Sequence, residues 1–266
     1  LARSENTART YANALGFFRQ VLDVRNISPD ETAIEAIDED ALGWTITALK
    51  VYAPTTERLY LAALTGFYEY LAAERIADIN LPRLRLLIRQ RARRPGQRLP
   101  QFPREDIDTV IKEMESYAKP SQNDEKAQLR ALRDRAFIIT LADTGLRVHE
   151  ACALRRGDVD WNEGRAMIIG KGDKQAVIRF SSRSMCAMKD YLSARQKLDG
   201  ASGHPLPSLP LFARHDKGAG NKTKPISTAT GRNIVNDCVR QILGEDAIGK
   251  ITPHSFRHYF VTTVLR

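Results

Sequence analysis

Apolar residues recur every three or four positions through the first 80 residues, which is the spacing of one face of an α-helix. Tyr11, Leu15 and Leu22 form such a stripe and predict a first helix. A second helix is predicted over residues 39–52, and a third from residue 55 onward. The pattern therefore predicts a small all-α domain in this part of the chain.

The remainder of the chain mixes helical periodicity with one β-rich region. Residues 166–169 and 176–180 are β-rich runs that flank a glycine-containing turn, so they predict an antiparallel hairpin. The expected fold class is mainly α with a small antiparallel β-sheet, with an N-terminal helical domain followed by an α+β domain. The expected helices of the second domain cover residues 104–117, 129–143, 150–154, 184–197, 228–243 and 253–266.

Positive charge is concentrated in one short segment. The formal net charge is +9, and residues 79–104 hold eight arginines and no acidic residue. Such a segment suits a polyanion, because each arginine on a phosphate releases condensed counterions; a solvated linker would have the same composition. Since this segment is also rich in proline, we expect a helical domain over residues 1–88, a basic linker over 89–104 and a second domain over 105–266.

Several classes of protein are excluded by composition and spacing. No apolar run approaches the roughly 18 residues of a membrane span, and the first ten residues do not read as a secretory signal. Cys152, Cys186 and Cys238 lie too far apart for a CxxC redox or zinc pattern, so we expect a reduced, cytoplasmic compartment. Phosphate-binding loops for nucleotides are absent from the sequence, and no cofactor is expected.

Two clusters of charged residues are candidates for chemistry on an anion. Arg147 follows the helix-ending Gly145, and Glu150 is placed three residues later to support it. An ordinary surface ion pair would show the same spacing. Lys171 and Lys174 lie in the predicted hairpin turn, where a lysine can reach a phosphate or a leaving oxygen, although most such lysines are simply solvated.

A third cluster lies near the end of the chain. Pro253 suits the first turn of a helix, which places His254 and Arg257 one turn apart on the same face. This pair near a helix N-terminus suits an anionic transition state. His254 and His258 also have the spacing of a zinc-binding pair, but the intervening arginine disfavours a metal, and we expect none.

Taken together and in this order, the clusters resemble the tyrosine recombinase (phage integrase) family. Residues 144–161 resemble the family's box around its first arginine, and residues 170–180 resemble its lysine-bearing hairpin. Residues 252–265 resemble its HxxR box, and residues 52–71 resemble the helical core-binding domain that precedes the catalytic domain. The resemblance implies a site-specific DNA recombinase or integrase that cuts and rejoins strands.

The resemblance also implies a role for each candidate residue. Arg147 and Arg257 would clamp the scissile phosphate, because two guanidiniums can hold its oxygens bidentately. Glu150 would support the site, Lys171 would be the general acid, and His254 would be the histidine of HxxR. The family forms a 3′-phosphotyrosyl intermediate that conserves the phosphodiester energy, so neither ATP nor a metal is implied.

The chain departs from the family pattern after HxxR. The second His or Trp and the nucleophilic tyrosine are not found before Arg266, and Tyr259 comes too early, so we interpret it as a packing residue. We therefore expect the chain as given to bind a double-stranded recombination site without cleaving it. It would be a monomer as given and a homotetramer on DNA when full length. The expected DNA contacts are Arg58, Arg91, Arg93, Arg94 and Lys174.

Two other functions remain open from the sequence. The first is a catalytically inactive accessory protein that occupies or bends DNA, although a pure binder has no need for the complete set of charged residues. The second is a type IB topoisomerase-like enzyme, which would relax supercoils without sequence preference.

Overall fold

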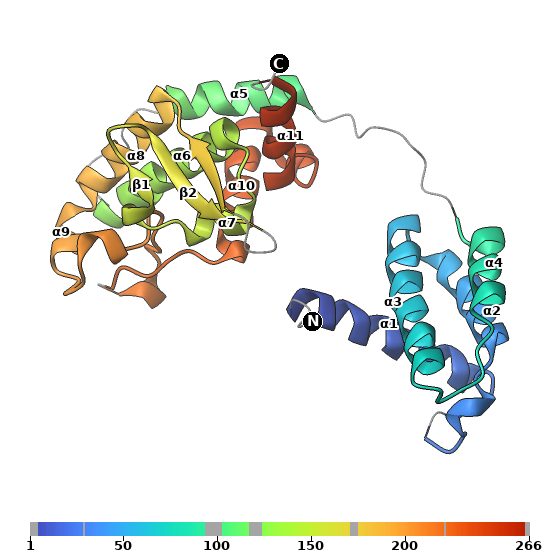
Figure 1. Cartoon of the computed structure of the whole chain (residues 1–266). Helices are drawn as coiled ribbons and strands as arrows, with labels where there is room; N and C mark the ends of the chain where they lie inside the picture. The colour runs from blue at the N-terminus through green and yellow to red at the C-terminus, as the bar shows by residue number, and fades with distance from the viewer. Residues whose placement is uncertain are drawn as a thin grey trace. The chain divides into compact units, whose positions relative to one another are not determined.

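The structure is a computed structural model in which the chain forms two compact units, Leu1–Leu99 and Pro100–Arg266 (Figure 1). Each unit has its own hydrophobic core. Across the described part of the chain, helices are either too short or too polar to cross a membrane. The structure describes residues 5–28, 30–93, 103–116, 124–170, 175–220 and 222–263.

The first unit is all-α in its described residues, as the hydrophobic spacing predicts. Phe18, Leu22, Leu64 and Tyr68 meet in its core, where each is at least 96% buried. The Tyr68 hydroxyl donates a hydrogen bond of 2.9 Å to the carbonyl of Asp38 at the start of a neighbouring helix. The helices are α1 (Glu5–Val24), η1 (Ile34–Ala36), α2 (Glu39–Ala48), η2 (Leu49–Val51), α3 (Pro54–Ala73) and α4 (Leu81–Arg91).

The sequence predicts that the linker starts at residue 89, but helix α4 continues to Arg91. The Asn80 side chain caps the helix by accepting from the Arg83 amide at 3.0 Å, and Pro82 stands in the first turn, where proline is tolerated. Leu84 and Leu87 face the core at helical spacing. The helix continues through the basic residues to Arg91, because their long polar side chains occupy its exposed face.

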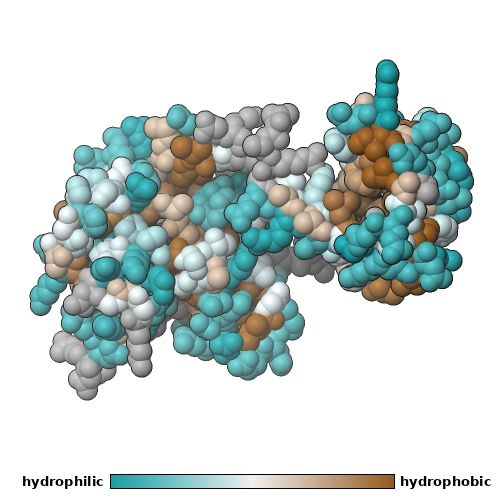
Figure 2. Space-filling view, turned by 90° about the horizontal axis from the view of Figure 1, so that it is seen from below, coloured by the Kyte–Doolittle hydropathy of each residue, from teal (hydrophilic) through white to brown (hydrophobic). Residues whose placement is uncertain are grey.

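The surface of this unit alternates between charged and apolar areas. Val24 and Val51 are more than 80% exposed, and Tyr70 is 56% exposed. Figure 2 shows brown areas set among the teal of its charged side chains.

A buried carboxylate joins α3 to the end of α4. Glu57 is 1% exposed and accepts hydrogen bonds from Lys50 at 2.7 Å and from the Arg93 amide at 2.9 Å. The Arg93 guanidinium binds the other Glu57 oxygen and the Tyr52 carbonyl. Burial alone would raise the pKa of Glu57, but the hydrogen bonds from Lys50 and Arg93 outweigh it and lower this pKa to about 2.

We predict that Glu57→Gln destabilises the first unit by about 2 kcal/mol at pH 7, because two cations lose their shared anion. The folded-state pKa of Glu57 lies below its ordinary value of 4.5, so its contribution is present above pH 4.5 and is lost as the pH falls towards 2. Urea unfolding at pH 7 and pH 3 measures both effects. The control is Glu69→Gln on the same helix, which removes an exposed pair with Arg85; equal effects of the two variants would contradict the prediction.

The second unit is built around α6, whose C-terminal half is buried on all sides. This helix contacts α5, α8, α10 and α11, and Figure 1 shows these helices around it. Phe137 on α6 packs edge-on against Phe212, with ring centroids 5.1 Å apart. The α-helices are α5 (Arg104–Glu115), α6 (Glu125–Thr144), α7 (Val148–Ala153), α8 (Ser182–Ala194), α9 (Gln196–Gly200), α10 (Thr228–Leu243) and α11 (Pro253–Thr263).

The predicted hairpin is present as part of a small antiparallel sheet. Strands β2 (Arg165–Ile169) and β3 (Gln175–Arg179) pair with Met167 opposite Val177. A two-residue strand, β1 (Val159–Asp160), extends the sheet to the order β1-β2-β3 and was too short to give a sequence signal. The fold class is therefore mainly helical with one small antiparallel sheet, as predicted.

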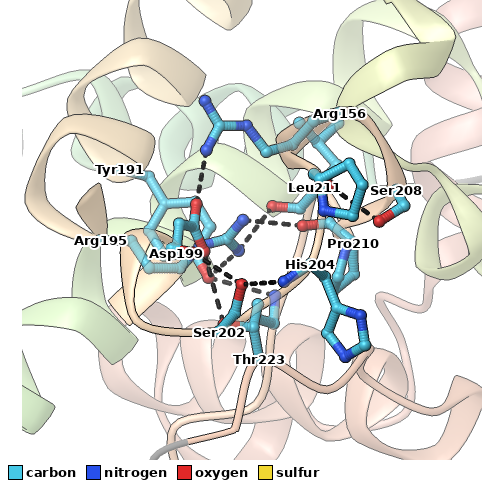
Figure 3. Close-up of polar contacts among 12 residues, drawn as sticks. Arg156, Tyr191, Arg195, Asp199, Ser202, His204, Ser208, Pro210, Leu211 and Thr223 are labelled. Atoms are coloured by element: carbon cyan, nitrogen blue, oxygen red, sulfur yellow. Dashed lines mark hydrogen bonds and ion pairs between the residues drawn. The ribbon is translucent and has the colours of Figure 1, made fainter. Parts of the chain in front are cut away.

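The long segment after α9 is fixed to the body of the unit by two buried charges (Figure 3). Arg195 is fully buried and donates hydrogen bonds to the carbonyls of Pro210 at 2.8 Å and Leu211 at 3.1 Å. Asp199 lies 2.9 Å from the Arg195 guanidinium and accepts a hydrogen bond from Arg156 at 2.6 Å. These contacts tether the segment to the body of the unit at Pro210 and Leu211.

Candidate active site

The turn between α6 and α7 requires glycine at position 145. Gly145 has φ +61° and ends α6, which is the left-handed conformation that favours glycine after a helix. A Cβ at this position would lie 2.5 Å from the Phe260 ring of α11. The turn thus brings α11 into direct contact with the end of α6.

Arg147 begins α7 and is held by a buried carboxylate. Glu150 accepts a hydrogen bond from the Arg147 amide at 2.7 Å and another from its guanidinium at 2.9 Å. The Glu150 side chain is 5% exposed, whereas that of Arg147 is 47% exposed. The carboxylate therefore fixes both the backbone and the head of an arginine whose remaining edge is open to solvent.

Arg257 on α11 is anchored to the same turn. Its guanidinium donates a hydrogen bond of 2.6 Å to the carbonyl of Gly145. The helix is fixed on its other side by Tyr259, whose hydroxyl donates to Asp108 of α5 at 2.6 Å. Burial and the nearby Asp108 raise the pKa of Tyr259 to about 12, so this tyrosine is a neutral packing residue.

His254 lies one turn before Arg257 and is exposed at the site. Its ring packs edge-on against His258, with centroids 4.5 Å apart. Partial burial, followed by the charges of His258, Arg257 and Arg147, lowers the pKa of His254 below its ordinary value of 6.5. The imidazole is therefore neutral at pH 7, and it can donate or accept a hydrogen bond.

These side chains surround one cavity of about 460 Å³, which Arg147, His254 and Arg257 line together. Arg232 and Asn236 of α10 also line it, and the sequence motifs gave no reason to select them. Their only signal is an i, i+4 spacing on a predicted helix, which is common to many exposed polar pairs. The remaining lining includes Val148, His149, Gly249, Thr252 and Pro253.

The cavity is suited to a phosphodiester. Two permanently charged guanidiniums and a neutral imidazole can bind an anion and stabilise charge that develops on it. Lys171 and Lys174 of the hairpin turn lie outside the described residues. Among the residues that the structure does describe, His, Cys, Asp and Glu do not gather in groups of three that could hold a metal ion.

The predicted DNA contacts of the first unit differ in their exposure and in whether their guanidinium groups already have partners within the protein. Arg58 is exposed and lines a groove between α3 and α4 together with Arg89. Arg91 is exposed at the end of α4. Arg93, in contrast, donates hydrogen bonds to Glu57 and to backbone carbonyls, so it has the fewest donors left to bind a phosphate. Arg94 lies outside the described residues.

The sequence pattern of the Phage integrase family matches residues 105–266. The chain belongs to the phage integrase family of tyrosine recombinases. The integrase is 28% identical to the tyrosine recombinase XerC of Thermodesulfovibrio yellowstonii over 262 residues, which cover 98% of this chain and 77% of the relative. It is 29% identical to XerC of Bacillus subtilis over 265 residues, which cover 98% and 78% of the two chains.

Solved structures agree on the fold of this integrase. It matches XerH recombinase in a post-cleavage complex with its difH substrate, with TM-score 0.69, 20% identity and coverage of 96% and 68% of the two chains. It also matches the Tn1549 transposon integrase in complex with transposon right-end DNA, with TM-score 0.62, 14% identity and coverage of 97% and 86%. At these identities the likeness establishes the fold.

We predict that Gly145→Ala destabilises the integrase by at least about 2 kcal/mol, because a left-handed alanine is strained and its Cβ would meet Phe260. Chemical denaturation monitored by circular dichroism measures the change. The matched control is Gly200→Ala, at a glycine with open space around its Cβ position, which should change stability by less than about 0.5 kcal/mol. A Gly145→Ala protein as stable as this control would show that the turn does not require glycine at position 145.

Proposed function

We propose that this integrase is a site-specific recombinase that cuts and rejoins double-stranded DNA through a 3′-phosphotyrosyl intermediate. The observation that carries the proposal is that Arg147 and Arg257 line one cavity together with His254. Both arginines are positioned by the turn at Gly145, whose carbonyl accepts a hydrogen bond from Arg257. The similarity to XerC proteins over nearly the whole chain supports the same activity.

The two arginines have complementary free edges for a phosphate. Each uses one terminal nitrogen, Nη1, within the protein: Arg147 binds Glu150, and Arg257 binds the Gly145 carbonyl. Among the described residues no partner occupies Nε and Nη2 of either side chain. These two nitrogens form one edge of the guanidinium, so each arginine can bind a non-bridging oxygen bidentately as charge develops there.

The remaining steps are proton transfers and hydrogen bonds. Attack of a tyrosine hydroxyl on the phosphorus forms the phosphotyrosyl bond, breaks the bond to the 5′-oxygen and releases the hydroxyl proton to solvent or to a neighbouring base. The leaving 5′-oxygen in turn needs a proton. We assign this proton to Lys171 as general acid. His254, neutral at pH 7, hydrogen-bonds the phosphate or assists the proton transfer, and Glu150 keeps Arg147 in place.

The first unit would bind the duplex from a second side. Arg58 and Arg91 are its best placed phosphate contacts. Arg94 of the same unit, and Lys174 in the hairpin turn of the second unit, are further contacts at positions outside the described residues. We propose a homotetramer as the recombining assembly of the full-length protein and the cytoplasm, where the DNA substrate is found, as its location. Phosphate contacts of this kind position the protein and do not read sequence.

We predict that Arg147→Ala and Arg257→Ala each slow formation of the covalent protein–DNA adduct by at least about 100-fold, because charge on the phosphate loses a preorganised donor pair. The full-length gene product is incubated with a nicked substrate carrying the site it selects from a random DNA pool, and the adduct is resolved on denaturing gels. Binding of the same DNA should fall much less than cleavage.

The control is Arg240→Ala on α10, whose guanidinium is paired with Asp237 and Glu245. This variant should form the adduct at the wild-type rate. If either site variant matched it, the arginines would not be the phosphate clamp.

A further inference from the structure

Arg232 is a third guanidinium at the active-site cavity. It is exposed on α10 and lines the cavity together with Arg147 and Arg257. The motifs that carry the family resemblance do not include Arg232, and the chemistry proposed above does not use it.

The position of Arg232 is fixed by the residue before it. A Cβ on Gly231 would lie 2.9 Å from both the Val148 side chain and the Cys152 sulfur of α7. Helices α10 and α7 therefore pack at the distance that only glycine permits. Because Arg147 immediately precedes Val148, this contact holds the backbones of Arg232 and Arg147 in a constant relation.

Arg232 also differs from its neighbours in having no anionic partner in the part of the chain that the structure describes. Arg147 is paired with Glu150, and Arg240 further along α10 is paired with Asp237. Within the described residues, the Arg232 side chain makes neither a hydrogen bond nor an ion pair. Three like charges around one cavity repel one another, so this arrangement is stabilised when anions enter the cavity.

The pKa of the Cys152 thiol is consistent with this position of the Arg232 guanidinium. Burial raises the pKa of Cys152 to about 11, and the charge of Arg232 opposes that rise. The Arg232 charge thus acts on the α7 side of the cavity.

The scissile phosphate has no need of a third arginine. A phosphodiester has two non-bridging oxygens, and the free edges of Arg147 and Arg257 can satisfy both. The phosphates of a DNA strand follow one another at each 3.4 Å of helix axis, so a neighbouring phosphate lies within reach of the same cavity.

We propose that Arg232 contacts the phosphate adjacent to the scissile phosphate on the cleaved strand, with the Asn236 amide one helical turn further along as a second donor. This inference rests on the proposed function, because it needs a bound DNA strand in the cavity. The contact would hold the strand in register while the scissile phosphate reacts, which makes Arg232 a positioning residue.

The first test is the salt dependence of DNA binding by the chain, measured by fluorescence anisotropy on a duplex that carries the selected site. Loss of one phosphate contact should reduce the slope of log K against log salt by about 0.9 in Arg232→Ala. Arg240→Ala should keep the wild-type slope. Arg232→Lys retains the charge and should recover most of the slope, and an unchanged slope in Arg232→Ala would overturn the proposal.

The second test identifies the phosphate. Single methylphosphonate substitutions, which remove one phosphate charge at a time, are scanned through the same duplex. Arg232→Ala should become insensitive at a position directly next to the one at which Arg147→Ala and Arg257→Ala become insensitive.

Each other result has a definite meaning. Insensitivity at the same position as the Arg147 and Arg257 variants would make Arg232 a third clamp of the scissile phosphate and overturn the proposal. Unchanged sensitivity with altered base preference would make it a base contact, and would overturn it equally. Failure of the proposed function would look different, because the wild-type chain would then select no DNA site.

Discussion

The candidate active site depends on the backbone of a single turn, because Gly145 positions both Arg147 and Arg257 at the cavity. Its left-handed conformation ends α6 and directs the chain into α7, where Arg147 stands two residues later. Its lack of a side chain admits the Phe260 ring, and its carbonyl accepts the hydrogen bond that orients Arg257. Two arginines that are 110 residues apart in sequence are therefore held by one peptide segment, with little freedom left to lose when a phosphate binds.

Buried carboxylates determine which arginines of this integrase are structural and which are free. Glu57 forms an ion pair with Arg93, and Asp199 forms one with Arg156. In both cases the guanidinium is bound within the protein and stabilises the fold. Glu150 differs because it holds only one end of Arg147 and leaves the other edge open. An arginine paired with a buried carboxylate thus stabilises the fold at Glu57 and Asp199, whereas at Glu150 the same interaction orients a side chain that lines the cavity.

The sequence predicted most of the fold because hydrophobic spacing and helix-ending residues are local signals. It also placed Arg147, His254 and Arg257 correctly on a helix-ending turn and on one face of a later helix. It placed the start of the linker inside α4, because seven arginines and three prolines between residues 79 and 100 are typical of a linker, whereas Leu84 and Leu87 of this segment bury a helical face. It could not select Arg232, because only the close packing of Gly231 against α7 brings that residue to the cavity.

Part of the positive charge of the basic segment is neutralised by ion pairs in the folded protein. Arg83 pairs with Glu39 and Asp40, and Arg85 pairs with Glu69, so the acidic residues of the preceding helices neutralise part of the arginine run. Electrostatic attraction to DNA depends on the charges that remain unpaired, since a phosphate must displace any internal partner before it can bind. Among the described residues, the unpaired positive charge of the helical unit is therefore carried by a few arginines, such as Arg58 and Arg89, rather than by the whole segment.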